Sequence, residues 1–399
     1  MTDEPLFNPW SPAFHADPYP AYHRLRTREP IHESPFGFLV ISRHEDCMAV
    51  LRDQRFGREG FEQLFQSVYG EEEERHRIPR SMLFRDPPNH TRLRSLVNKA
   101  FTPRVIETMR DHIESLVTGF LDRVQGAGRM DVIDALAYPL PVTVICEMLG
   151  VPVADHESMR GWSSDIARSL DAFGLPQHAD IALKGRLARQ KIVEYFRAII
   201  PERRRAPRED LLSLLIAAEE AGDKLSEGEL LATCVLLFIA GHETTVNLIG
   251  NGTLALLRHP DQLARWRDDP RLGATAIEEL LRYDSPVQRT ARMPVEDIEI
   301  WGRQVKKGQM VVAALGAANR DPAVFADPDR LDLGRTENKH LSLGFGIHYC
   351  LGAPLARVEG QIAIGSLLRR MPKLALATDQ LEWRESSTLR GLKSLPVTF

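Results

Sequence analysis

The sequence predicts a mainly α protein with a small β-sheet region, and two observations carry that prediction. Apolar residues recur at three- and four-residue intervals in long segments, as in amphipathic helices; these segments are 91–101, 103–124, 179–200 and 227–258. Strand-like segments, rich in β-branched or aromatic residues and bounded by turn residues, are few; they are 37–42, 296–314 and 395–399. We find no internal repeat, which argues against a helical solenoid.

The segment 227–258 is the longest expected helix, and its middle is apolar on nearly every side. Such a helix has to run through the interior of the protein. Its longest uncharged stretch, about a dozen residues around LLATCVLLFIAG, is shorter than the roughly 20 residues that span a bilayer. We therefore expect a central core helix and no membrane segment.

Composition and charge exclude several classes of protein. The 399 residues are 43% hydrophobic and 27% charged, which suits a globular protein with a sizeable core. A formal net charge of -4 argues against a nucleic-acid-binding protein. The N-terminus, MTDEPLFNPWSPAF, is acidic and proline-rich and lacks the regions of a signal peptide. We expect a cytoplasmic protein.

The four cysteines are isolated from one another, so no CxxC zinc or redox pattern exists. Cys47, Cys146 and Cys234 have apolar neighbours, and we expect each to be a small buried hydrophobe. Cys350 differs because it follows a glycine-rich turn and precedes an amphipathic helix.

The turn around Cys350 contains Gly344, Gly346 and Gly352, which permit positive φ and close approach of a large group to the main chain. A cysteine at a helix N-terminus is favoured as the thiolate, which acts either as a nucleophile or as a metal ligand. His348 is the only nearby base for a nucleophile, and residues two apart in a tight turn usually point apart.

The stretch LGFGIHYCLGAPLAR, residues 343–357, resembles the haem-thiolate loop of the cytochrome P450 family, especially its soluble bacterial members. The resemblance implies that Cys350 is the axial ligand of haem b, that His348 contacts a haem propionate, and that Leu343 and Gly344 belong to the cofactor loop. The departure is Leu343, where the family usually has a phenylalanine that shields the ligand sulfur. Its effect on the redox potential is left open.

The stretch AGHETT, residues 240–245, places polar groups inside the apolar helix, where each needs a partner. Gly241 weakens the helix by about 1 kcal/mol relative to alanine, which suggests that it makes room for another group. A zincin HExxH motif is excluded because residue 246 is valine. The match to a dinucleotide fingerprint at 250–255 lies within a helix, so it is accidental.

The resemblance makes AGHETT the family's oxygen-activation motif. It implies that Gly241 opens the helix beside the haem, and that Glu243 and Thr244 deliver protons for cleavage of the O–O bond. For Thr245 we favour a hydroxyl bonded back to its own helix.

Glu279 and Arg282 stand three apart in EELLR, a spacing that by itself predicts a surface ion pair of about 0.2–0.5 kcal/mol. The resemblance instead makes them the ExxR motif, buried behind the haem loop, with Arg330 as the third member. It also implies that His90, Arg94 and Arg292 meet the haem propionates together with His348.

The resemblance extends from DPYPAYHRLR near the start to LPVTF at the end. It implies one triangular, helix-rich domain over residues 1–399, with haem b between the central helix 227–258 and the cysteine loop 343–352. The implied reaction inserts one oxygen atom of O2 into an apolar small molecule, as in the members that oxidise macrolides, terpenoids, steroids or fatty-acyl chains. Because no fused flavin domain follows Cys350, we expect electrons from a separate ferredoxin and its NAD(P)H-dependent reductase. We expect a monomer.

Two alternatives stay open. The first is a peroxide-driven fatty-acid enzyme of the same fold, against which the Glu243–Thr244 pair argues because those members usually lack it. The second is a haem-binding sensor or electron carrier without turnover, which would not need Gly241, Glu243 and Thr244 around an oxygen pocket.

Two surfaces are also expected. Apolar character assigns the substrate pocket to residues 61–84 and 170–173, Ile239, Ala240 and the stretch after Pro286. A positive patch for an acidic ferredoxin would comprise Arg92, Lys99, Arg104 and Arg357, with scattered surface charge as the alternative.

Overall fold

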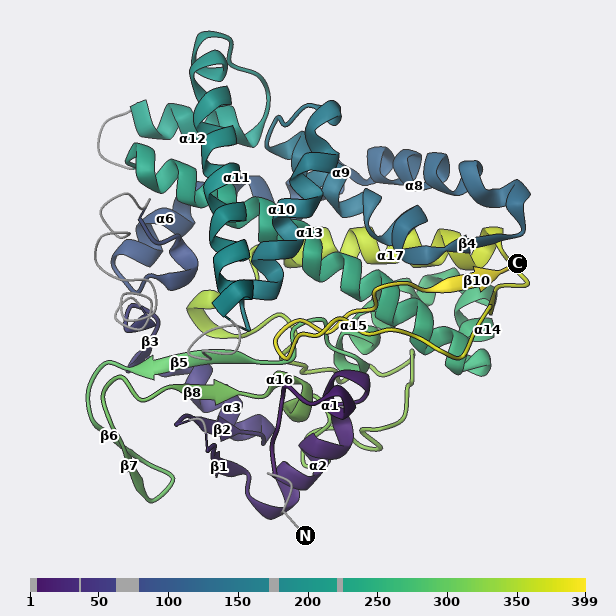
Figure 1. Ribbon diagram of the computed structural model, residues 1–399. Helices are drawn as coiled ribbons and strands as arrows, with labels where there is room; N and C mark the ends of the chain where they lie inside the picture. The colour runs from purple at the N-terminus through teal and green to yellow at the C-terminus, as the bar shows by residue number, and fades with distance from the viewer. Residues whose placement is uncertain (1–5, 36, 62–78, 172–178, 221–224) are drawn as a thin grey trace. The chain divides into compact units, whose positions relative to one another are not determined.

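The computed structural model describes residues 6–35, 37–61, 79–171, 179–220 and 225–399 (Figure 1). The chain divides into two compact units. The first comprises Met1–Phe56, Ile106–Leu140 and Thr244–Phe399, and the second comprises Gly57–Val105 and Pro141–Glu243. The longest helix, α13 (Glu227–Arg258), carries the chain from the second unit into the first between Glu243 and Thr244. That the whole chain acts as one domain stays a prediction.

The main sheet of the first unit has the strand order β1-β2-β8-β5-β3. Its strands are β1 (Ile31–Glu33), β2 (Leu39–Ile41), β8 (Val311–Ala313), β5 (Thr290–Pro294) and the short β3 (Phe56–Gly57). β2 pairs with β8 in parallel, whereas β1 pairs with β2 and β5 with β8 antiparallel. Successive side chains point to opposite faces: Leu39 and Ile41 enter one hydrophobic core, and Val40 enters the other. The sheet is therefore buried on both faces.

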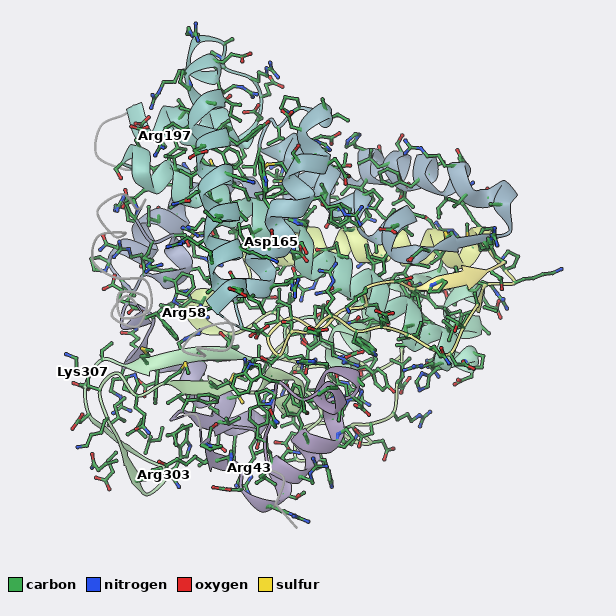
Figure 2. The ribbon with its side chains drawn as sticks, in the orientation of Figure 1. Arg43, Arg58, Asp165, Arg197, Arg303 and Lys307 are labelled. Atoms are coloured by element: carbon green, nitrogen blue, oxygen red, sulfur yellow. The ribbon has the colours of Figure 1, made fainter. Side chains whose placement is uncertain are left out.

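The remaining strands form two smaller sheets in the first unit. One contains β4 (Arg129–Asp131), β10 (Pro396–Thr398) and β9 (Ala375–Leu376), and the other is the hairpin of β6 (Ile298–Ile300) and β7 (Arg303–Val305), marked by Arg303 in Figure 2. All three predicted strand regions contain strands. The sequence did not predict β1, β3, β4 or β9, since strands of two or three residues are too short to show an alternating pattern.

Three helices of the first unit pack against α17 (Ala353–Arg370), which follows Cys350. It packs against α8 (Arg110–Val124), α14 (Pro260–Asp268) and α15 (Gly273–Tyr283), and α8 runs alongside it in Figure 1. Four shorter helices lie near the sheet: α1 (Pro12–Ala16), α2 (Tyr19–Arg28), α3 (His44–Arg52) and α16 (Leu315–Ala318). The predicted helix 103–124 is interrupted, because α7 (Pro103–Glu107) ends before α8 begins.

The second unit is helical in its described part. It contains α6 (Asn89–Asn98), α10 (His156–Ser169), α11 (Ala179–Arg205) and α12 (Leu211–Glu220), and α9 (Pro139–Met148) enters it from the first unit. α10 lies along α11 at close range, since a Cβ on Gly185 would come within 2.2 Å of Ser169 Cβ. The predicted loop 201–210 is wrong in its first half, because α11 continues through Pro201 to Arg205 and buries Arg203 against Asp210. The other charged loop, 71–77, lies outside the described residues.

α13 has the bounds predicted for the central helix. It is the one helix among the described residues that is long and apolar enough to cross a membrane, judged by length and composition, and 72% of its apolar window is buried within the protein. Burial of this extent is typical of a core helix, as the sequence predicted. The mainly α fold class with small sheets is thus confirmed.

Candidate functional site in the cytochrome P450 fold

The cysteine loop folds back on itself just before α17. The backbone N–H of Cys350 donates to the carbonyl of Leu343 over 2.8 Å, and that of Gly344 donates to Leu341, also over 2.8 Å. Gly344 and Gly346 have φ of +72° and +71°, in the left-handed region that favours glycine. A short 3-10 turn, Gly346–His348, then leads to Cys350, and α17 begins three residues later at Ala353. The predicted turn ahead of a helix is therefore present.

Cys350 differs in its surroundings from the other three cysteines. Cys47, Cys146 and Cys234 are fully buried, whereas Cys350 is partly exposed, and none of the four forms a disulfide. Burial raises the pKa of the Cys146 and Cys234 thiols to about 12, so both are neutral thiols at ordinary pH. The sequence correctly separated Cys350 from three inert core residues.

Gly346 is required for steric reasons as well as for its φ. A Cβ at this position would lie 2.5 Å from the backbone oxygen of Leu51, which follows from the packing of the loop on α3. A Cβ on Gly344 would meet only the carbonyl of His348, at 3.5 Å, among its neighbours within 4 Å. The loop is thus pinned to the end of α3 through Gly346.

We expect Gly346→Ala to destabilise the protein by more than the about 1–2 kcal/mol that a left-handed alanine costs, because the methyl group also collides with Leu51. Gly344→Ala carries the same backbone cost without the collision, and Gly126→Ala has neither. Urea denaturation of the three variants should therefore rank them Gly346, Gly344, Gly126 in decreasing loss. Equal midpoints for Gly346→Ala and Gly344→Ala would show that the contact with Leu51 is unimportant.

Behind the loop, Arg282 of α15 is fully buried with all five of its N–H donors used. Nε and Nη2 each donate to one carboxylate oxygen of Glu279, with N···O distances of 2.8 Å. The remaining hydrogens reach the backbone carbonyls of Asn319, Pro328 and Arg330, at 2.7–3.0 Å. The pair is therefore buried rather than a surface pair, as the resemblance implied.

Arg330 is not the third member of this network, contrary to the prediction. Its side chain is exposed, and only its carbonyl contacts Arg282. The N–H of Arg330 donates to the carbonyl of Asp327, whose φ is 47°. The backbone of Arg330 therefore faces Arg282, and its side chain faces solvent. The second guanidinium on Glu279 comes from Arg335, whose Nε lies 3.2 Å from Oε2. Asn338 donates to the same oxygen over 3.1 Å.

The middle of α13 has one face that is not fully buried. Leu236, Ile239, Ala240, Gly241 and Thr244 are half-buried or exposed, while the residues between them are buried. Leu236, Ala240 and Thr244 follow one another at four-residue intervals along one face of the helix, and Ile239 and Gly241 flank Ala240. We call this set the open face of α13. It is apolar except for the hydroxyl of Thr244, so it suits contact with an apolar planar group or substrate.

Gly241 has a further structural reason to lack a side chain. A Cβ there would lie 2.7 and 2.8 Å from two side-chain carbons of Ile145 on α9. Close packing of α9 against α13 by itself explains this glycine. Its predicted place beside the haem stays a prediction.

Glu243 does not belong to the open face. It is buried together with His242, and both contact Ser163 of α10: Ser163 Oγ lies 2.6 Å from His242 Nε2 and 3.1 Å from Glu243 Oε1. Glu243 and Thr244, adjacent in sequence, thus differ in surroundings, with the carboxyl inside the second unit and the hydroxyl on the open face.

The predicted propionate ligands come from both units. His90 and Arg94 lie on α6 of the second unit, with His90 buried and Arg94 half-buried. Arg292 is buried on β5 of the first unit, where its Nη1 donates to Thr290 and to the carbonyl of Ala291. His348 is half-buried in the cysteine loop. That these four meet one cofactor stays a prediction.

The expected positive patch is weaker than the sequence suggested. Arg92 forms an ion pair with Glu229, and Arg357 donates to both oxygens of Glu278, at 2.6 and 2.8 Å. Burial opposes ionisation of Glu278, yet the hydrogen bonds from Arg357 and His340 lower its pKa to about 2. Two of the four charges are thus neutralised locally. Of the expected pocket, residues 62–78, 172 and 173 lie outside the described residues.

Sequence comparison decides the family. Residues 34–269 and 272–383 match the family model described as Cytochrome P450. The chain belongs to the cytochrome P450 family. It is 41% identical to the polyketide biosynthesis cytochrome P450 PksS of Bacillus subtilis (strain 168), covering 99% of this chain and 98% of the relative. It is 42% identical to the cytochrome P450 monooxygenase PikC of Streptomyces venezuelae, covering 97% and 92%.

The fold agrees with this assignment. The crystal structure of P450BioI in complex with hexadec-9Z-enoic acid ligated acyl carrier protein has a TM-score of 0.88, with 42% identity over 98% of this chain and 100% of that one. This P450 is therefore a haem b enzyme of the monooxygenase type, as the sequence predicted.

The described residues fit a haem. Cys350 is partly exposed in a loop held by two left-handed glycines, and the open face of α13 interrupts an otherwise buried helix. Among the described residues no group of three or more His, Cys, Asp or Glu side chains could hold a metal ion by itself. An iron carried by a macrocycle and ligated by one thiolate is consistent with that finding.

Sequence reasoning missed three polar residues of this region: Ser163, Arg335 and Glu359. Ser163 lies 79 residues before its partner His242, and no local pattern marks it. Glu359 is fully buried on α17, so its pKa is well above the ordinary value, and the hydroxyl of Thr245 acts against that rise. Thr245 therefore lies near Glu359 of α17, and its predicted bond to its own helix stays a prediction. A glutamate next to the apolar positions of α17 was the available signal.

Proposed function

We propose that this P450 hydroxylates an apolar small molecule of polyketide or fatty-acyl type, with Cys350 as the axial ligand of the haem. The open face of α13 carries the proposal, since it presents Leu236, Ile239 and Ala240 immediately before the Glu243–Thr244 pair. The relatives support the substrate class: PksS is named for polyketide biosynthesis, and P450BioI was crystallised with an acyl carrier protein bearing a C16 acyl chain. Terpenoids and steroids, the other expected classes, are alternatives.

A spin-state titration tests the substrate class. Displacement of water from the iron by an apolar ligand shifts the Soret band, so myristic acid, a macrolactone and testosterone should be compared as probes. We expect saturable shifts with the fatty acid or the macrolactone. A shift with testosterone alone would overturn the proposed class.

The haem supplies the activation of O2, and this chain's own residues supply protons and exclude water. Thr244, half-buried on the open face, would deliver a proton from its hydroxyl. Glu243, next to it in the helix, would exchange a proton through its buried carboxyl. His90, Arg94, Arg292 and His348 provide the cations and donors that two haem propionates need.

Electrons reach the haem from a separate ferredoxin and its NAD(P)H-dependent reductase, and the enzyme works as a cytoplasmic monomer. Lys99 and Arg104, which are exposed, are the members of the expected patch that an acidic partner would meet. Reduction by a plant-type ferredoxin should slow as salt rises, because exposed charges are screened. A rate independent of salt would argue against an electrostatic docking surface.

We expect Thr244→Ala to separate electron consumption from product formation. NADPH oxidation should continue, while product per NADPH falls by about 10²-fold, the lower end for loss of a proton-transfer group, and hydrogen peroxide accumulates. Thr233→Ala is the matched control, because Thr233 lies on the same helix with its hydroxyl bonded to the carbonyl of Glu229 over 2.7 Å. Unchanged coupling in Thr244→Ala would remove Thr244 from the proposed mechanism and favour the peroxide-driven alternative.

A further inference from the structure

Ser163, His242 and Glu243 form a buried cluster inside the second unit that the motif does not explain. Ser163 and His242 are fully buried, and Glu243 is 2% exposed. α10 contributes the serine, and Asp165, labelled in Figure 2, marks this helix two residues further on. His242 Nε2 also lies 3.6 Å from Glu243 Oε1, so all three groups are within reach of one another.

The positions of the hydrogens follow from the acceptors. His242 Nδ1 lies 2.6 Å from the carbonyl of Phe238, which can only accept, so Nδ1 carries a hydrogen. Ser163 Oγ has one hydrogen and two partners, Nε2 and Oε1. For both contacts to be hydrogen bonds, Oγ donates one and accepts the other. The accepted hydrogen then comes from Nε2 or from the carboxyl of Glu243.

The cluster therefore holds one proton more than a neutral imidazole and a carboxylate would hold. In one arrangement, Nε2–H donates to Oγ and Oγ–H donates to a carboxylate. In the other, the carboxylic acid donates to Oγ and Oγ–H donates to a neutral imidazole. The two arrangements differ by a concerted shift of two hydrogens along the same contacts, and no heavy atom has to move far.

We propose that Ser163 and His242 are positioning residues that hold this proton and pass it to Glu243. From the arrangement with an imidazolium and a carboxylate, Nε2–H passes to Ser163 Oγ while Oγ–H passes to Oε1, which leaves a neutral imidazole and a carboxylic acid. Glu243 then gives up that one proton. Water restores the proton to the cluster between turnovers. The proposal deepens the proposed function, because it depends on Glu243 as the acid beside Thr244.

The arrangement also restrains Glu243. Its carboxyl is held toward α10 in the second unit, while Thr244 is on the open face. The ring of His242 packs on Phe238 with centroids 4.9 Å apart, and its Nδ1 bond fixes the ring plane. Nε2 therefore points at Ser163 Oγ in a fixed ring orientation. Such preorganisation lowers the free-energy cost of each proton transfer.

The first test is the protonation state of the resting, haem-loaded enzyme, which needs no turnover. Infrared difference spectra between wild type and Glu243→Gln report a carboxylic acid, and nitrogen NMR of histidine in the diamagnetic ferrous carbonmonoxy form, compared with His242→Phe, reports an imidazolium. We expect one of these two signals in the wild type and its change in Ser163→Ala. A carboxylate together with a neutral imidazole in the wild type overturns the proposal.

The second test is coupling, measured with the probe that gives the largest spin-state shift and a plant-type ferredoxin chain. A group that acts through Glu243 should matter less than Glu243, so we expect Ser163→Ala to lower product per NADPH about tenfold, below the about 10²-fold of a direct proton donor. Ser169→Ala is the matched control on the same helix, since its hydroxyl bonds to the carbonyl of Ile166 over 2.7 Å. Ser163→Thr, which keeps a hydroxyl, should restore coupling.

The variants separate this inference from the proposed function. Loss of coupling in Glu243→Gln but not in Ser163→Ala or His242→Phe refutes the inference and leaves the role of Glu243 intact. Full coupling in Glu243→Gln refutes both. Should Ser163→Ala fail to load haem, His242→Phe decides, because it keeps the ring contact with Phe238 and removes both ring nitrogens.

Discussion

Cys350→Ala should abolish the long-wavelength Soret band of the reduced carbon monoxide complex, and monooxygenase activity with it. In the proposed mechanism the Cys350 thiolate is the haem ligand that donates electron density for O–O cleavage, and the other three cysteines are buried. The measurement is a difference spectrum of the reduced, haem-loaded protein with and without carbon monoxide.

Cys234→Ala serves as the control for Cys350→Ala. Cys234 is buried on α13 with a thiol whose pKa is raised to about 12, so its loss should leave the band unchanged. Survival of the band in Cys350→Ala would assign the axial ligand to another residue, and the proposed mechanism would fail with it.

Arg282→Ala should destabilise the protein by about 3–5 kcal/mol, because it leaves the buried Glu279 carboxylate without its main counter-charge. Arg335 and Asn338 still contact that carboxylate, so the loss is partial. Three backbone carbonyls, those of Asn319, Pro328 and Arg330, also lose their donor. Urea denaturation of the haem-loaded protein, together with its haem content, measures the effect.

A matched control for Arg282→Ala is Arg271→Ala. Arg271 pairs with Asp269, but its side chain is 90% exposed, so loss of this ion pair should change the stability little. Arg282→Lys should fall between the two, since one ammonium cannot serve five acceptors. If Arg282→Ala lowers the free energy of unfolding by less than about 1 kcal/mol, the network of Arg282 and Glu279 does not stabilise the protein as proposed.

The sequence predicted the fold class and the main landmarks of the site because those depend on local patterns. Apolar residues at three- and four-residue intervals predicted the bounds of α13. The glycines with positive φ predicted the turn before Cys350. The network around Glu279 shows where local prediction fails, because Arg335 and not Arg330 supplies the second guanidinium. Both arginines lie between α16 and the cysteine loop, and no local pattern shows which of them reaches Glu279.

Local sequence also gave incomplete reasons for residues that it identified correctly. Gly241 was predicted to make room for the cofactor, and the structure adds Ile145 of α9 as a packing reason. The structure also places Thr245 near Glu359 of α17, a neighbour that the segment around Thr245 does not indicate. Both neighbours are distant in sequence, so no window along the chain could contain them.

By itself, then, the sequence determined that this P450 is mainly helical, that Cys350 precedes a helix, and that Glu243 and Thr244 interrupt an apolar core helix. These are properties of consecutive residues, fixed by backbone preferences and hydrophobic periodicity. Only the tertiary structure decided which distant groups face them: Arg335 on Glu279, Leu51 against Gly346, and Ser163 between His242 and Glu243. The physical reason is that the partners of buried polar groups come from other elements that pack against them, and the sequence of a single segment does not specify that packing.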